Sequence, residues 1–422
     1  MQQKMKVLLM AWLLALFGAE VTSAAEDTVL KEIQELKTRI EALENRLETQ
    51  NHLISTQSQA LVLQQARTKE LAGISEAFDR LDIALGATSV IQGSSGNDDT
   101  RGHDDSDASY SVDIEITAAI GENGTALLYL EGGEGSGLNN ERQGFQGCNA
   151  DALDDDADLQ ISELWYEQRF FRGRLTATFG KMDVTRWFDA NAVANDETLQ
   201  FLADAFVNNI AVEFPDYAYG ARMTLGLTKI IDLSLGLLEA DSDFEDIFDE
   251  NFMILELAFR PVCFGHPGNY RLYGWYNSGD KTSFKHPAAT RKNGGGFGLS
   301  FDQQLTDQFT VFARYGRQDD DVYEVKSAWS VGAQLGGARW GRSNDMLGVA
   351  YGSAHTGTYY RRALRSGGLR SAASEKTFEV YYRFRLNDHI SLSPDLQITD
   401  AMAGQDNQES VTILGLRAKL DF

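Results

Sequence analysis

The sequence predicts an all-β fold: a transmembrane β-barrel of about sixteen antiparallel strands, preceded by an α-helical coiled-coil segment. First, between residues 81 and 422, apolar side chains recur at every second position in short segments, so each segment has one apolar and one charged face. Second, the charged faces carry arginines and acids together, as a water-filled interior does, while the apolar faces suit lipid. Third, the connections alternate between short and long, as they do in bacterial outer-membrane barrels.

The alternation is clearest near the C-terminus. In residues 377–386, Phe378, Val380 and Phe384 point to one side, whereas Glu379 and Arg383 point to the other. A soluble β-sandwich also alternates, but its apolar face is buried between two sheets. The mixed charges on the polar face favour a barrel whose inside is wet.

Composition limits the alternatives. The 422 residues contain 39 Gly and only 5 Pro, which fits many strands with tight turns. The net charge of −24 argues against nucleic acid as a partner, because that binding uses basic patches. The 2 cysteines are too few for a disulfide scaffold.

Residues 1–25 have the features of a secretory signal peptide. Lys4 and Lys6 precede an apolar run over residues 7–17, and small residues follow, which predicts cleavage near Ala24 or Ala25. After this segment there is no apolar run of about 18 residues, so the sequence predicts export without a transmembrane helix.

Residues 26–80 are predicted to form a periplasmic coiled coil, because the apolar period changes from two to three and a half. The alternative is an isolated single helix. The number of chains stays open, since Ile at a and Leu at d favour a dimer whereas porin barrels usually form trimers. The a positions are Ile33, Ile40, Leu47, Ile54 and Leu61, and the d positions are Val29, Leu36 and Leu43, followed by Gln50, Gln57 and Gln64.

Residues 81–422 contain the strand-like segments of the predicted barrel. The long connections, 94–108, 134–158, 184–218 and 355–376, are placed outside the cell, and the short ones in the periplasm. Cys148 then falls in an outside loop and Cys263 in a periplasmic turn, so no disulfide is expected between them. The predicted strands are 81–92, 109–121, 125–133, 159–170, 174–183, 219–228, 233–240, 252–260, 269–278, 295–303, 309–317, 326–337, 345–354, 377–386, 390–399 and 411–422.

Several segments resemble the carbohydrate-selective porin family of the OprB type. They are FGKMDVTRWFDANAVANDETLQFL at 179–202, GNYRLYGWYN at 268–277, GLSFDQQLTD at 298–307 and the closing hairpin around 393–397 and 415–417. The resemblance implies a sixteen-stranded outer-membrane porin, usually trimeric, that passes sugars by diffusion. The coiled coil departs from the simplest members and suggests an added anchoring role.

Strand parity selects candidate pore-lining residues. Arginine and carboxylate groups can hydrogen-bond sugar hydroxyls, or they can pair with each other and stiffen the wall. Aromatic rings can stack on a sugar ring, or they can pack beneath loops. The candidates are Glu115, Glu131, Glu163, Trp165, Glu167, Arg222, Glu256, Arg260, Arg271, Tyr273, Trp275, Arg314, Arg383 and Arg417.

Residues 187–202 form the predicted constriction loop, with a loop lying over the outer mouth as the alternative. The loop's polar residues would narrow the channel and offer hydrogen bonds at its neck. They are Asp189, Asn191, Asn195, Asp196 and Glu197.

The outer loops also carry acidic clusters, around Asp104, Asp154, Asp241 and Asp319. Loose Ca²⁺ or Mg²⁺ binding that bridges lipopolysaccharide is one interpretation, but the EF-hand spacing is absent, which favours solvated loops and no metal site. The sequence has no HExxH or CxxC motif, and Asp280 interrupts a P-loop-like stretch, so neither an enzyme nor a cofactor is predicted.

The function predicted from these observations is passive, carbohydrate-preferring diffusion through the outer membrane of a Gram-negative-type bacterium. The alternatives are an anion (phosphate-type) or general porin, and a barrel that tethers the envelope through its coiled coil. The expected partners are sugars and small solutes, outer-membrane lipid and lipopolysaccharide, further copies of the chain in a trimer, and peptidoglycan through the coiled coil.

Overall fold

The computed structural model describes residues 2–78, 80–96, 105–153, 158–245, 249–288, 293–406 and 410–422. The chain forms two compact units, Met1–Asp79 and Arg80–Phe422, and each is described by itself.

The first unit is a single helix, α1 (Gln2–Phe78). Over residues 28–70 every side chain is exposed, including the heptad positions, where Ile33 is 48 % and Ile54 62 % exposed. The predicted helix is confirmed. Within the described part of the chain, no other side chains cover its apolar stripe, so the coiled coil stays a prediction. The signal peptide also stays a prediction, because the side chains of residues 1–25 lie outside the described part. None of the described helices is long and apolar enough to cross a membrane.

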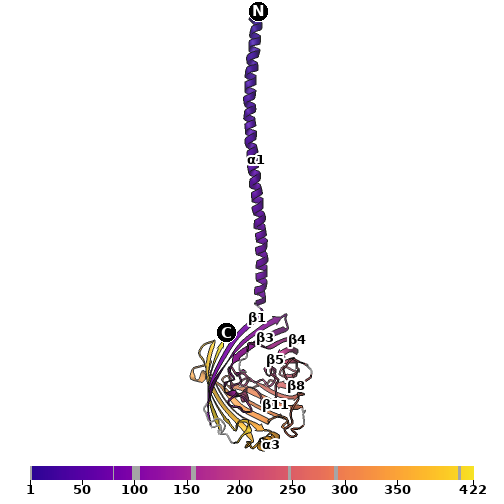
Figure 1. Ribbon diagram of the computed structural model, residues 1–422, viewed down its shortest axis with the longest axis vertical. Helices are drawn as coiled ribbons and strands as arrows, with labels where there is room; N and C mark the ends of the chain where they lie inside the picture. The colour runs from indigo at the N-terminus through magenta and orange to yellow at the C-terminus, as the bar shows by residue number, and fades with distance from the viewer. Residues whose placement is uncertain are drawn as a thin grey trace. The chain divides into compact units, whose positions relative to one another are not determined.

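The second unit is a closed antiparallel barrel (Figure 1). Sixteen of the strands in its described residues pair in sequence order, and β17 returns to β1 along Gly86↔Asp421 to Ser95↔Thr412. The short β9 (Val262–Cys263) pairs only with the start of β10, whose neighbours in the wall are β8 and β11. Closure leaves the sheet without an open edge, which a bilayer would not tolerate.

The barrel strands agree with the sixteen predicted segments to within a few residues. The predicted fold class is therefore confirmed. The strands are β1 (Leu81–Ser95), β2 (Ser106–Ile120), β3 (Gly124–Glu134), β4 (Gln160–Phe170), β5 (Leu175–Met182), β6 (Ala218–Gly226), β7 (Ile231–Glu239), β8 (Asn251–Phe259), β10 (His266–Asn277), β11 (Gly294–Thr306), β12 (Phe309–Gln318), β13 (Val325–Gly336), β14 (Met346–Thr356), β15 (Ser374–Arg385), β16 (Ile390–Asp400) and β17 (Val411–Asp421).

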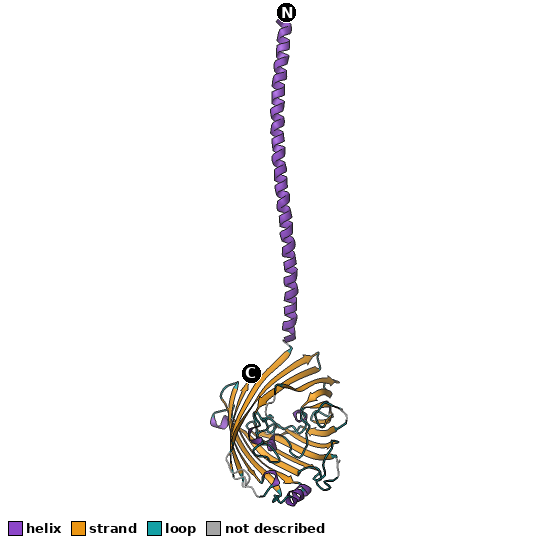
Figure 2. Ribbon diagram, in the orientation of Figure 1, coloured by secondary structure: helices purple, strands orange, loops and turns teal. Residues whose placement is uncertain are grey.

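The connections carry short helices that periodicity did not predict. They include α2 (Asp204–Val207) and α3 (Thr358–Ser366), which interrupts the predicted loop 355–376. Figure 2 shows loop segments and short helical turns within the ring of strands.

Burial in the barrel wall is the reverse of that in a soluble protein. Along β8, Leu255 is 51 % exposed, whereas its neighbour Glu256 is 1 % exposed. Leucines 235, 272, 299 and 414 on other strands are likewise exposed. An apolar outer face around a charged interior is the arrangement of a transmembrane barrel.

Candidate functional site

The connection between β5 and β6, residues 183–217, lies inside the barrel. It contacts Glu256 on β8, Arg314 on β12, Glu379 on β15 and Arg417 on β17, each in the middle part of its strand. Because these strands stand on different sides of a closed wall, one segment reaches them all only by crossing the interior. The segment is longer than the predicted loop 187–202, and we call it the inward loop.

Asp189 is the centre of the inward loop's attachment. It is fully buried, at a left-handed φ of 58°, and its Oδ2 lies 3.1 Å from Arg314 Nε. Its Oδ1 accepts a hydrogen bond from the Tyr273 hydroxyl at 2.8 Å, and its backbone N–H donates to Glu256 Oε2 at 3.0 Å. Three predicted wall residues thus form one buried network with the predicted loop residue Asp189. The wall residues are Glu256, Tyr273 and Arg314.

The other wall arginines near this end of the loop are also paired. Arg222 donates to Glu167 at 2.9 Å and its guanidinium lies 4.6 Å from the Trp187 ring centroid. Arg271 donates to Glu256 Oε1 at 2.7 Å and to the carbonyl oxygen of Trp187 at 3.1 Å. The predicted pairing that stiffens the wall is therefore present, and it also fixes the loop.

The second part of the loop is fixed through its backbone. Arg417 donates to the Gln200 carbonyl oxygen at 2.8 Å, and Arg383 to that of Leu199 at 3.4 Å. Glu379, which was not among the candidate residues, accepts from the backbone N–H groups of Leu202 and Ala203 at 2.6 and 3.0 Å.

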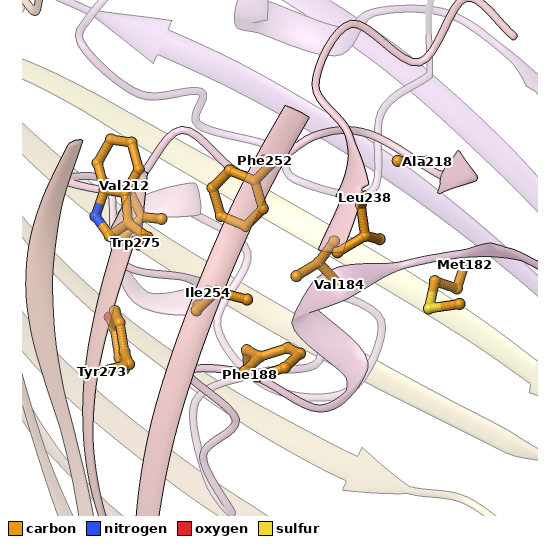
Figure 3. Close-up of a cluster of buried hydrophobic side chains, with 10 residues drawn as sticks. All are labelled: Met182, Val184, Phe188, Val212, Ala218, Leu238, Phe252, Ile254, Tyr273 and Trp275. Carbon is orange, nitrogen blue, oxygen red and sulfur yellow. The ribbon is translucent and has the colours of Figure 1, made fainter. Parts of the chain in front are cut away.

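Apolar side chains pack between the inward loop and the wall. Figure 3 shows Phe188 and Val212 of the loop beside Ile254, Tyr273 and Trp275 of the strands, which form one buried cluster. Trp275 also stacks on Phe252, with ring centroids 6.0 Å apart. Trp275 therefore packs beneath the loop, which was one of the two interpretations of the predicted aromatic residues.

The remaining predicted wall residues are placed differently from one another. Glu163 is 1 % exposed and accepts hydrogen bonds from Trp165 Nε1 and Arg186 Nε, both at 3.0 Å. Glu131 accepts from the Tyr217 hydroxyl at 2.8 Å, and Glu115 lies 3.5 Å from Arg186. Arg260, by contrast, follows the end of β8, is exposed, and pairs with Asp232 away from the other candidates.

Two polar residues of the predicted constriction, Asn191 and Asn195, attach the loop to the wall, and Asp196 shapes the loop itself. Asn191 donates to Ser300 Oγ at 3.3 Å, and the Asn195 side chain accepts from Arg314 at 3.1 Å. Asp196 accepts from the backbone N–H groups of Thr198 and Leu199 at 2.9 and 3.0 Å, an Asx-type turn.

A second connection, which follows β3 and is described over residues 135–153, also folds inward, which the sequence analysis did not predict. The Cys148 carbonyl oxygen accepts from Gln92 and Gln397 side chains at 3.0 and 2.9 Å. This segment joins the inward loop where Gly147 N–H donates to Asp204 Oδ2 at 2.8 Å. A Cβ on Gly147 would lie 2.8 Å from that oxygen, so glycine allows the approach.

The placement of Cys148 corrects one expectation. Cys148 is buried inside the barrel rather than carried on an outside loop, because its segment returns into the interior. Both Cys148 and Cys263 are free thiols, in agreement with the prediction that they are not bonded to each other.

A cavity of about 450 Å³ lies beside the inward loop. Five carboxylate residues line it, and no Lys or Arg is among its described lining residues. Of the predicted constriction residues, only Asn195 and Glu197 reach it. The carboxylates are Asp183, Glu197, Asp204, Glu213 and Asp216.

Three of these carboxylates have partners that define how they are held. Glu213 lies 2.6 Å from Lys281 Nζ and accepts from the Tyr323 hydroxyl at 2.8 Å. Asp183 caps the turn Val184–Arg186 by accepting from the Thr185 backbone N–H, and Asp204 accepts from the Gly147 backbone N–H. The cavity therefore combines negative charge with polar side chains such as Thr185, Asn208 and Tyr217.

The other acidic clusters are incompletely described. Asp104, Asp154 and Asp246 lie outside the described residues. Asp319 and Asp321 lie in a connection where Asp321 accepts from Ser283 Oγ at 2.6 Å.

Comparison with protein families gives one match, described as the carbohydrate-selective porin family, OprB type, over residues 97–422. Among curated proteins, the chain is 23 % identical over 267 residues to "Porin AaxA" of Chlamydia abortus, covering 61 % of this chain and 56 % of that protein. It is also 23 % identical over 243 residues to an uncharacterised protein of Aquifex aeolicus, covering 58 % of this chain and 63 % of that protein. The matched regions thus span less than two thirds of these relatives.

Among solved structures, OprB of Pseudomonas putida has a TM-score of 0.72 at 18 % identity, covering 82 % of this chain and 96 % of that one. The outer-membrane channel DcaP of Acinetobacter baumannii has a TM-score of 0.51 at 13 % identity, covering 81 % of this chain and 97 % of that one. At these identities the likeness concerns the fold.

Proposed function

The chain belongs to the carbohydrate-selective porin family of the OprB type, and we propose that it lets small neutral sugars diffuse passively through a neck formed by its inward loop. The family and the barrel fold are those of outer-membrane channel proteins, not of enzymes. What is proposed here is the preference for carbohydrate and the residues that produce it.

The observation that carries the proposal is the polar cavity beside the inward loop. Its volume of about 450 Å³ is within the range of about 300–1,000 Å³ typical of small-molecule sites. Carboxylates, amides and the Tyr217 hydroxyl can exchange hydrogen bonds with sugar hydroxyls in place of water. Asn195 and Asn208 supply amide donors beside the acids.

For ions, the same cavity favours cations over anions. The wall arginines direct their donors to carboxylates and loop carbonyls, whereas the cavity lining carries acids. Rings of acidic side chains favour cations in channels. This argues against the phosphate-type alternative, which the arginine-rich strands had suggested.

Planar-bilayer recordings in a salt gradient test both parts of the proposal. We expect a reversal potential with the sign of cation preference and an ion current that falls when glucose or sucrose enters the neck. Marked anion selectivity that sugar leaves unchanged would overturn it. Recorded well above pH 8, where the Glu197 carboxyl is charged, the variant Glu197→Gln serves as an internal control, since it should weaken the cation preference without closing the channel.

We further propose that copies of the chain associate through the helix α1, which lies in the periplasm, and that the barrels, as porins of this family usually do, set the number of chains at three. The uncovered stripe of Ile33, Ile40 and Leu47 supports this, because about 25 cal/mol per Å² of apolar surface is gained when such a stripe is covered. Deleting residues 26–73 should leave sugar flux intact and reduce the oligomer measured by light scattering in detergent.

The same deletion addresses the envelope-tethering alternative, in which α1 reaches peptidoglycan and lipopolysaccharide surrounds the wall. If cells that carry the shortened protein still take up sugar but shed outer membrane, the chain acts as a tether in addition to a channel. Unchanged envelope attachment would exclude it.

A further inference from the structure

Three carboxylates meet at the end of β7, away from the cavity of the inward loop. Glu239 is the last residue of β7, and Asp241 and Asp243 follow at alternate positions. One oxygen of each lies within 4.8 Å of the others. Since like charges this close repel, the arrangement needs a positive partner or protons.

Glu239 gives an independent reason to expect a ligand. Glu239 is only 2 % exposed, and its carboxylate oxygen Oε2 accepts from the Phe244 backbone N–H at 3.3 Å. The other oxygen, Oε1, is buried and has no hydrogen-bond partner in the described part of the chain. A buried carboxylate oxygen without a donor is costly, and in folded proteins it is generally satisfied by an ion or water.

The basic side chain of Lys181 does not fill this role. Lys181 Nζ lies 5.2 Å from the Phe244 ring centroid, but it donates its hydrogen bond to the Ile161 carbonyl oxygen at 2.8 Å. The rim therefore presents three acids and an unsatisfied oxygen, and none of the described Lys or Arg side chains forms an ion pair with them.

The type and arrangement of the ligands favour calcium among the divalent cations. Calcium binds six to eight oxygens at about 2.3–2.6 Å in a flexible geometry, often with water among them, so carboxylate oxygens that lie within 4.8 Å of one another can share one ion. Magnesium requires a near-ideal octahedron and releases its water reluctantly, so three carboxylates from one short segment suit it less well.

We propose that Glu239, Asp241 and Asp243 bind one calcium ion, with water completing its coordination. The ion would fasten the connection between β7 and β8 at the rim from which the inward loop starts. Phe244 of this connection contacts Tyr219, the second residue of β6, with ring centroids 6.2 Å apart. Calcium would thus stabilise the place where the chain leaves the inward loop and re-enters the wall.

Calorimetric titration of the chelator-treated, detergent-solubilised full chain with calcium chloride tests the site. We expect one ion per barrel chain with a Kd of roughly 0.1–1 mM, as in extracellular calcium modules, and a higher unfolding temperature with calcium than with chelator. The double variant D241N/D243N should lose both effects. Its two substituted residues are exposed, so folding should be retained.

A second double variant controls for charge. E122Q/D307N removes two exposed acids from turns between other strands and should bind calcium like the wild type. Glu239→Gln should weaken binding at least about tenfold, because it replaces the buried charged ligand. Failure to bind calcium at about 10 mM, equal binding by D241N/D243N, or equal loss in E122Q/D307N would each overturn the proposal.

Discussion

At the scale of single residues, Asp189 holds the inward loop in place. Its carboxylate faces Arg314 and Tyr273 and also accepts from the backbone N–H of Asn209 at 2.9 Å. Arg314 in turn donates to the carbonyl oxygens of Phe206 and Asp189 at 2.8 and 3.1 Å. Removing one member of a buried ion pair typically costs about 3–5 kcal/mol, because the other charge stays desolvated.

We predict that Asp189→Asn loosens the inward loop. The variant keeps the shape of the side chain but leaves Arg314 buried without its counter-charge, so resistance to denaturant should fall. Single-channel conductance and the entry rate of larger sugars should rise. The matched control is Asp196→Asn, whose carboxylate only stabilises a local turn in the same loop. Conductance that is equal in the two variants would contradict the role given to Asp189.

A second prediction concerns pH. Burial is the main cause that raises the pKa of the Glu197 carboxyl to about 8. The neighbouring Asp196, Asp151 and Asp183 contribute in the same direction. A carboxyl with a raised pKa is neutral below that pKa and charged above it. Cation preference, measured as the reversal potential, should therefore increase as pH rises through about 8. Glu197→Gln should remove this step, and a variant with the same step as the wild type would exclude Glu197 as its source.

Strand parity placed Glu163, Glu256, Arg314 and Arg417 on the inner face correctly, because alternation is a local property of the chain. Parity cannot say whether an inner residue faces solvent or lies beneath a loop. The cavity acids Asp183, Asp204, Glu213 and Asp216 follow no period, since they lie on a connection held by contacts distant in sequence. Arg260 follows the end of β8, where the alternation no longer fixes the face.

At the scale of elements, the strands were predictable and the inward connections only in part. The motif at 179–202 indicated one inward loop, but nothing periodic marked residues 135–153. Their place depends on Gln92 and Gln397, which are 56 and 249 residues from Cys148 in the chain. Few charges and several glycines in 135–150 distinguish this segment from the acidic loops, and that composition was the available signal.

The outer face of the strands gives a third prediction. Leu255, in the middle of β8 and paired with Leu235, faces outward. An arginine at the bilayer midplane destabilises a barrel by about 2–4 kcal/mol, and this cost falls to about 0–1 kcal/mol near the interface. Leu255→Arg should therefore destabilise the barrel in lipid vesicles by that larger amount, and Leu227→Arg, in the turn after β6, should cost much less. Equal effects measured by denaturant unfolding would contradict a lipid-facing β8.

At the scale of the whole molecule, the barrel unit combines a charged interior with two connections that fill part of it. The ion pairs and buried clusters leave a polar cavity rather than a solid core. The helix α1 forms a second unit whose exposed apolar stripe remains a predicted association surface.

Swelling of liposomes that contain the purified protein, in a graded series of sugars, tests the central claim of a sugar-permeable neck most directly. We expect fast swelling with monosaccharides, a steep decline toward trisaccharides, and a shift of that decline to larger sugars in Asp189→Asn. Swelling at the rate of protein-free liposomes for every sugar, or rates independent of sugar size, would contradict it.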